Sequence, residues 1–172
     1  MARHPLGFPG IYLIIQIQDE EAPKGCKVQK VWDRMWGKIR DDVIAGLRKH
    51  VHTRRLVITG ISLGGALAGL SYVDIQATGE FDNVEIVTYG APRVGNRKWA
   101  KWFDSITEST RIYIRRDPIA FLPRCLTLLC NYKQTGNPIV CYPGKEECRC
   151  KNKAEADDEE FDGALEFLYK EV

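Results

Sequence analysis

A serine between glycines is the feature of this sequence that most directly suggests chemistry. Ser62 is the central residue of segment 60–64, GISLG, which matches the pattern G-x-S-x-G. An apolar stretch of strand length precedes the match at 56–59, and a helical pattern over 63–76 follows it. A sharp turn from strand to helix holds a serine hydroxyl out as a nucleophile. A glycine-rich turn in which Ser62 only caps the helix is the alternative.

The geometry of such a turn predicts roles for the neighbours of Ser62. Side chains two positions before and two positions after the serine would collide, so we expect glycine to be required at Gly60 and Gly64. The backbone N–H of Leu63 begins the helix, where unpaired donors and the helix dipole stabilise an oxyanion. The stretch therefore indicates a serine nucleophile with an oxyanion donor beside it.

A serine nucleophile needs a base, normally an imidazole, and an acid that orients the base. Asp117 closes an apolar strand that begins at residue 111, and Pro118 stops that strand. Because parallel strands end at the same edge of a sheet, we expect Asp117 to lie near Ser62. An ordinary turn residue is the alternative for Asp117.

The histidines are the obstacle to this chemistry. The chain has three of them, His4, His50 and His52, and none follows residue 52. His50 and His52 precede the strand that leads to Ser62, and seven strand residues at about 3.3 Å each place them about 20 Å or more away. His4 lies before the first strand, again at the wrong edge. The sequence thus supplies a nucleophile and an acid without a base.

The elements that must position these residues alternate between strand and helix. Apolar runs predict strands at 11–17, 56–59, 84–89 and 111–114, and helical spacing predicts helices at 28–49, 63–76, 99–106 and 161–169. Alternation of this kind predicts an α/β fold, a mostly parallel sheet with helices on both faces. We expect a single domain over residues 1–172, with 145–160 as a charged loop or tail.

Three blocks in order resemble the class 3 (fungal-type) lipases of the α/β-hydrolase superfamily. TGISLGGALA at 59–68 is similar to the family's T-G-H-S-L-G-G-A-L-A, VTYGAPRVGN at 87–96 to G-x-P-R-V-G-N, and DPIAFLP at 117–123 to D-P-V-x-x-L-P. The resemblance implies an α/β-hydrolase fold, shortened here at the N-terminus. It also implies Ser62 as nucleophile, Asp117 as triad acid, and hydrolysis of acylglycerol or other carboxylic esters without a metal or organic cofactor.

The chain departs from the family at two places. The family's histidine lies in a C-terminal block of the type D-H-x-x-Y, whose equivalent position here is Gly163 or Ala164, and neither can accept a proton. The family's second oxyanion donor comes from an R-G-[ST] turn, which segment 18–22 lacks. Two functions stay open: a weakly active serine ester hydrolase, or an inactive homologue that binds lipid or a protein. A carboxylate within 157–160 is a further candidate base.

Composition limits the classes of binding partner that we expect. The 172 residues carry 25 basic and 23 acidic side chains, a net charge of +2, which gives no reason to expect nucleic acid or an anionic membrane. No apolar run approaches the ~20 residues that span a bilayer, and no secretory signal is recognised, so a cytoplasmic location is the default expectation. Three roles stay open for the apolar segment 119–130. It could wall an acyl pocket, contact a lipid interface or belong to the core.

The six cysteines leave two possibilities open. An even number permits disulfides in an oxidising compartment, whereas their spacing is not the pattern of paired knuckles that a zinc site uses. The sequence does not reveal which cysteines pair.

Overall fold

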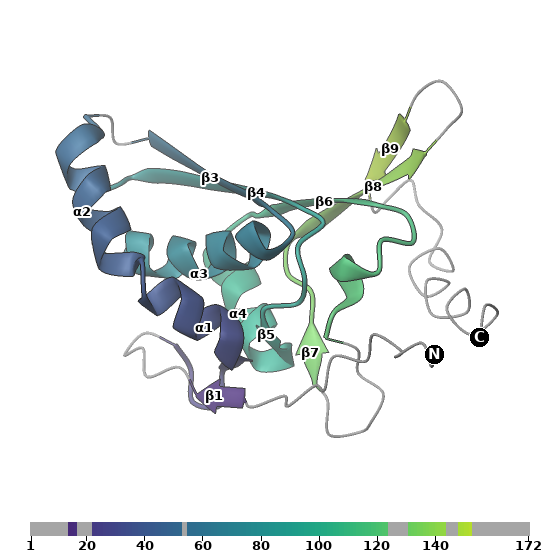
Figure 1. The fold of residues 1–172 in the computed structure, drawn as a ribbon, viewed down its shortest axis with the longest axis horizontal. Coiled ribbons are helices and arrows are strands. Elements are labelled where there is room, and N and C mark those ends of the chain that lie inside the picture. Colours follow the sequence, from purple (N-terminus) through teal and green to yellow (C-terminus); the bar gives the residue numbers. More distant parts are fainter. Residues whose placement is uncertain (1–13, 17–21, 53–54, 124–130, 144–147, 153–172) are drawn as a thin grey trace, which may run out of the picture.

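The computed structural model describes residues 14–16, 22–52, 55–123, 131–143 and 148–152. A five-stranded sheet is the frame of this part of the chain (Figure 1). Its strands run in the order β3 (Arg55–Ile61), β4 (Asn83–Tyr89), β6 (Thr110–Ile114), β8 (Asn137–Pro143) and β9 (Cys148–Asn152). The first four are parallel and β9 is antiparallel to β8. The predicted mostly parallel α/β sheet is confirmed.

Four α-helices of the described residues accompany the sheet: α1 (Lys30–Gly37), α2 (Arg40–His50), α3 (Leu63–Ala77) and α4 (Arg97–Ile106). A short 3₁₀ helix, η1, spans Ile119–Phe121. The prediction of one long helix over 28–49 is wrong, because residues 27–29 form a strand and the chain leaves the helix after Gly37. Glycine is a poor helix former, and the Ile39 N–H donates to the Trp36 carbonyl at 2.9 Å in the tight turn that follows. The helices predicted over 63–76 and 99–106 agree with α3 and α4.

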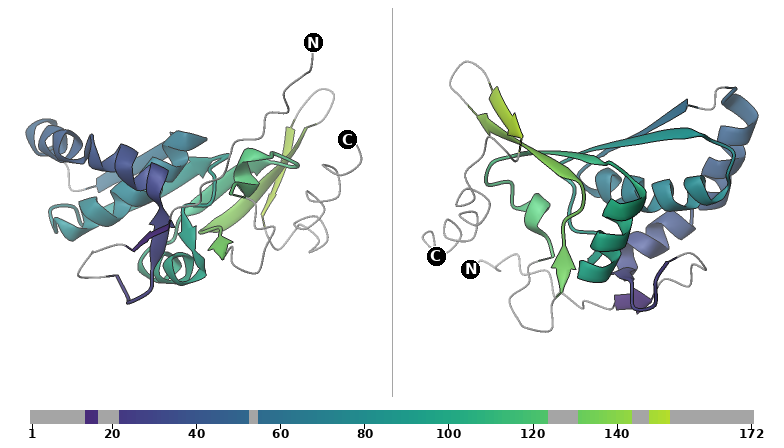
Figure 2. Two further views of the ribbon diagram at one scale, coloured as in Figure 1. Left: turned by 60° about the horizontal axis from the view of Figure 1, so that its bottom comes forward. Right: turned by 180° about the vertical axis from the view of Figure 1, so that it is seen from behind.

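The helices of the described residues all lie on one side of the five-stranded sheet, although we expected helices on both faces (Figures 1 and 2). No helix of the described residues covers the opposite face. Along β3 every second residue is exposed, and these include Val57, which is 53% exposed, and Ile61, which is 73% exposed. Burial thus alternates as it does in a strand that is covered on one side.

A second, antiparallel sheet lies beside the helices. It runs in the order β1 (Ile14–Gln16), β2 (Lys27–Gln29), β5 (Gly95–Asn96) and β7 (Tyr132–Lys133). The apolar run 11–17 was expected in the parallel sheet, but its described part, β1, pairs with β2 in antiparallel register. Only ten residues, 17–26, lie between these two strands, which is too few for the crossover that a parallel connection requires.

The charged segment 145–160 contains a strand that we did not predict. Cys148–Asn152 forms β9, which pairs with β8 at the edge of the sheet. An edge strand accepts charged side chains because one of its sides faces water, so the lack of apolar periodicity was misleading. The helix predicted over 161–169 lies outside the described residues.

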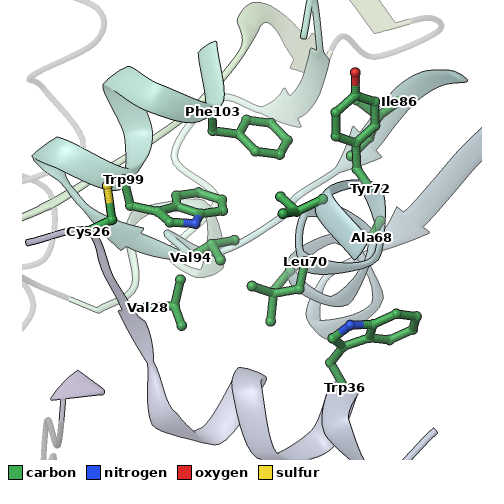
Figure 3. Packing of buried hydrophobic residues seen from close by; sticks show 12 residues of the cluster. Cys26, Val28, Trp36, Ala68, Leu70, Tyr72, Ile86, Val94, Trp99 and Phe103 are labelled. Atoms are coloured by element: carbon green, nitrogen blue, oxygen red, sulfur yellow. The ribbon is translucent and has the colours of Figure 1, made fainter. Parts of the chain in front are cut away.

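The core lies between α3, α4 and the small antiparallel sheet (Figure 3). Trp99 is fully buried on α4 and stacks on Phe103, with 4.9 Å between ring centroids. The ring of Tyr72 on α3 meets Phe103 edge to face at 5.6 Å. Small residues on α3 let this helix approach the segment that follows β4 closely. A Cβ at Gly65, for example, would lie 2.6 Å from the Ala91 Cβ.

Two cysteines have a defined state. Cys141 on β8 is disulfide-bonded, and Cys26 is a buried free thiol whose pKa is raised by burial, against the opposing effect of Lys98. Disulfides form and persist in oxidising compartments. Among the described residues, no helix is long and apolar enough to cross a membrane, and no three potential ligands gather where they could hold a metal ion.

Candidate active site

Ser62 occupies a strained turn between β3 and α3. Its backbone has φ 52° and ψ −122°, a conformation that costs a residue with a side chain of the order of 1–3 kcal/mol. The turn is held by two hydrogen bonds: the Ser62 N–H donates to the Tyr89 carbonyl at 2.8 Å, and the Gly65 N–H donates to the Ser62 carbonyl at 3.0 Å. The Ser62 side chain forms no cap hydrogen bond with the helix and is exposed. The geometry therefore does not support a simple helix cap.

The glycines around Ser62 differ in what they permit. A Cβ at Gly60 would lie 2.2 Å from the backbone oxygen of Gly64, so only glycine fits there. A Cβ at Gly64 would meet nothing within 4 Å, so the steric reason that we predicted for Gly64 is wrong. The close approach belongs instead to Gly65, the next residue, which packs against Ala91.

Leu63 is the first residue of α3. Its N–H therefore has no partner carbonyl within the helix, and the dipole of α3 adds positive potential at this end. This position suits an oxyanion donor. Of segment 18–22, where the family's second donor would lie, residues 18–21 are outside the described residues.

Asp117 is held at the end of a tight turn after β6. The Asp117 N–H donates to the Ile114 carbonyl at 3.0 Å, and its Oδ1 accepts a hydrogen bond from the Ile119 N–H at 2.9 Å. Arg116, just before it, has φ 67°, a left-handed conformation that is rare for residues other than glycine. The turn fixes one carboxylate oxygen and leaves Oδ2 for another partner.

Gly90 completes this side of the site, and the sequence reasoning missed it. It has φ +55°, and a Cβ there would lie 2.8 Å from the Asp117 Oδ2. Its N–H donates to the Ile112 carbonyl at 2.8 Å, which ties the end of β4 to β6. Its place directly after the predicted strand 84–89 was the signal that could have identified it.

One cavity of about 340 Å³ brings Ser62 and Asp117 together at the carboxyl ends of β3, β4 and β6. Apart from these two residues and Gly90, its lining is largely apolar: Ile61, Tyr89, Ile112, Tyr113, Ile114, Ile119 and Cys141. Within segment 119–130, Ile119 lines the cavity while Ala120 is buried in a small core cluster. Residues 124–130 lie outside the described part.

The described histidines lie at the other end of β3. His50 is the last residue of α2, and His52 follows it just before β3 begins at Arg55. The seven residues of β3 then extend about 23 Å at 3.3 Å per residue before Ser62 is reached. Neither imidazole serves Ser62 in this fold. His4, Gly163 and Ala164 lie outside the described residues.

The parallel sheet and the serine turn at its carboxyl edge place the chain in the α/β-hydrolase fold. A triacylglycerol lipase described as having a serine protease triad has a TM-score of 0.68 at 23% identity, over 81% of this chain and 53% of its own. A lipase from Rhizopus microsporus var. chinensis has a TM-score of 0.67 at 24% identity, over 83% and 49%. The family model for Lipase (class 3) matches residues 12–127. The chain belongs to the class 3 lipase family.

Curated relatives are longer than this chain. Secreted mono- and diacylglycerol lipase A of Penicillium cyclopium is 32% identical over 102 residues, which is 58% of this chain and 33% of the relative. Secreted mono- and diacylglycerol lipase 3 of Gibberella zeae is 37% identical over 91 residues, 49% of this chain and 28% of the relative. The chain therefore spans about a third of the length of these relatives.

Proposed function

We propose that Ser62 is the nucleophile and Asp117 the acid of a carboxylic-ester hydrolase that acts on acylglycerols or similar esters. The observation that carries this proposal is the strained, uncapped Ser62 in an apolar cavity that also contains Asp117. An apolar wall suits an acyl chain, since burying each CH₂ contributes about 0.8 kcal/mol. The mono- and diacylglycerol lipases among the relatives support the same substrate class.

The reaction would follow the serine-hydrolase course. The Ser62 Oγ attacks the ester carbonyl carbon while its proton passes to a base, and the carbonyl oxygen becomes an oxyanion against the Leu63 N–H. The C–O bond to the alcohol breaks as the alcohol takes up a proton, which leaves an acyl group on Ser62. Water then attacks the acyl carbon and releases the carboxylic acid. Asp117 would orient and stabilise the protonated base.

The described residues bring no imidazole base to Ser62 for this scheme. In the 172-residue chain no histidine follows residue 52, and the two described histidines lie at the far end of β3. Removing a triad member costs several orders of magnitude in rate. We therefore expect this chain by itself to hydrolyse esters slowly.

A second function is an inactive homologue that binds lipid or a protein partner. It is favoured by the exposure of large apolar side chains around the cavity, with Ile61 at 73% and Ile114 at 54% exposed. Contiguous exposed apolar surface commonly marks an interaction site. Lipid binding without any Ser62-dependent turnover would favour this function over the first.

Imidazole in solution tests the first function directly, because the cavity is open and Ser62 is exposed. Turnover of a p-nitrophenyl ester is measured with increasing imidazole for the wild-type chain, Ser62→Ala and Ser105→Ala. Ser105 is an exposed serine on α4 whose hydroxyl only donates to the Trp102 carbonyl at 2.6 Å. We expect imidazole to accelerate the wild type and Ser105→Ala beyond the Ser62→Ala rate. An equal response of all three proteins would contradict the role of Ser62.

A further inference from the structure

A second cavity, of about 310 Å³, lies beside the first and differs from it in chemistry. Four cationic side chains line it: Arg93, Arg97, Arg111 and Lys133. Tyr113 on β6 lines both cavities, so the two are neighbours. The volume is at the lower end of the range for small-molecule sites, about 300–1,000 Å³.

Two of the guanidinium groups are withdrawn from water. Arg111 on β6 is only 8% exposed, and its Nε donates to the Thr135 carbonyl at 3.2 Å. Its guanidinium carbon lies 4.6 Å from the centroid of the Tyr113 ring, a cation–π contact. Arg93, which follows β4, donates from Nη1 to the Pro123 carbonyl at 3.3 Å. Its Nε is buried and has no hydrogen-bond partner among the described residues.

The charge of this pocket is poorly balanced. Burial lowers the pKa of Arg93, and the positive charge of Arg111 lowers it further. Burial likewise lowers the pKa of Arg111, against the opposing effects of Tyr113 and Asp104. The Asp104 carboxylate also accepts a hydrogen bond from the Gly136 N–H at 2.7 Å, so part of it is already engaged. Buried like charges are costly unless an anion joins them.

We propose that this pocket binds a phosphate group, through the Arg93 and Arg111 guanidinium groups with Arg97 and Lys133 at its rim. A guanidinium presents a rigid fork of N–H donors that matches phosphate oxygens, and the hydrogen bonds are charge-assisted. Arg97 and Lys133 are exposed and would meet the anion first. The net charge of +2 concealed this site, because binding depends on the local field and not on the sum over the chain.

The same phosphate chemistry has two sources, a soluble phosphate or the headgroup of a phospholipid. Calorimetric titration with inorganic phosphate at constant ionic strength tests the first source. Co-sedimentation with phosphatidylcholine vesicles, with and without phosphatidic acid, tests the second. Both experiments use the full chain and compare Arg97→Gln/Lys133→Gln with Arg34→Gln/Lys38→Gln. The second pair removes the same charge from exposed positions on or next to α1, and thermal unfolding confirms that both variants fold.

We expect saturable binding that weakens at least tenfold in Arg97→Gln/Lys133→Gln and stays within twofold of the wild type in Arg34→Gln/Lys38→Gln. Binding of inorganic phosphate with this pattern identifies a soluble anion as the source. Binding only to vesicles that contain phosphatidic acid, with the same pattern, identifies a headgroup. No saturable binding to either probe, or equal weakening in both variants, overturns the proposal. None of these outcomes depends on ester turnover, so this site and the proposed function fail separately.

Discussion

The two ends of β3 carry different residue types of a catalytic triad. At the carboxyl end, Ser62 sits in a strained turn and shares a cavity with Asp117 from the end of β6. At the amino end lie His50 and His52, whose imidazoles are the proton acceptors that such a serine needs. A parallel sheet brings the ends of distant strands together but keeps the two edges apart. Possessing residues of the types that a triad needs therefore differs from having them together at one edge of the sheet.

Supplying an imidazole at the carboxyl edge should have the largest effect on this comparison. Following the family resemblance, we expect Gly163→His or Ala164→His to raise p-nitrophenyl ester turnover about 100-fold or more, since general bases contribute about 10²–10⁴. Initial rates of both variants against the wild type measure the gain.

The control adds Ser62→Ala to whichever histidine variant is active, which must return turnover to the background rate. A gain that survives Ser62→Ala would show that the new histidine acts without the proposed nucleophile. No gain in either variant would contradict the assignment of the missing base to these positions.

Breaking the serine turn should have the next largest effect, on folding stability. Gly60→Ala forces a Cβ to within 2.2 Å of the Gly64 backbone oxygen, so we expect a loss of about 3 kcal/mol in the free energy of unfolding. Gly64→Ala is the matched control, because a Cβ there meets nothing within 4 Å and alanine favours a helix by about 0.5 kcal/mol or more. Urea unfolding of both variants decides the point, and equal losses would contradict the observed close approach.

The contact between Gly90 and Asp117 should show a smaller effect. Gly90→Ala places a Cβ 2.8 Å from the Asp117 Oδ2 at a residue with φ +55°. Gly79→Ala, at φ +66° with open space around it, carries only the conformational cost of about 1 kcal/mol. We expect Gly90→Ala to lower the free energy of unfolding by about 1 kcal/mol more than Gly79→Ala does, because it adds an overpacked contact. Thermal or urea unfolding measures the difference, and identical values would show that the carboxylate moves away freely.

The histidines at the amino end should matter least. His50→Gln and His52→Gln remove the two described imidazoles at positions about 20 Å from Ser62. We expect ester turnover by either variant to stay within twofold of the wild type, whether measured with or without added imidazole. A tenfold fall in either case would mean that the amino end of β3 contributes to the chemistry after all.

The sequence predicted those elements whose signals are local. The apolar run before Ser62 and the small-residue helix after it are contiguous, so β3, α3 and the turn between them followed from periodicity. β8 and β9 were missed because β8 begins with Asn137-Pro138 and β9 is charged. Strands of this kind are stabilised by partners distant in the sequence and not by their own pattern.

The residues of the candidate site also fall into those with a local sequence signal and those without one. Ser62 and Asp117 each follow a recognisable strand, and each could be placed at the carboxyl edge without a structure. The roles of Gly90 and of the Arg93–Arg111 pair depend on how β4 and β6 lie side by side, which periodicity does not encode. The break after Gly37 was missed because a long amphipathic pattern continues through it, and one glycine was not enough to mark two helices.

The central claim is that the described residues place the proposed nucleophile and acid, but no imidazole base, at the carboxyl edge of the sheet. The most direct test is the rate of p-nitrophenyl ester hydrolysis by the wild-type chain divided by that of Ser62→Ala, at neutral pH without added imidazole. We predict a ratio within about tenfold of one, because a triad without its base retains little of its rate advantage. A ratio of about 10⁴ or more would mean that a base does reach Ser62, and would contradict the claim.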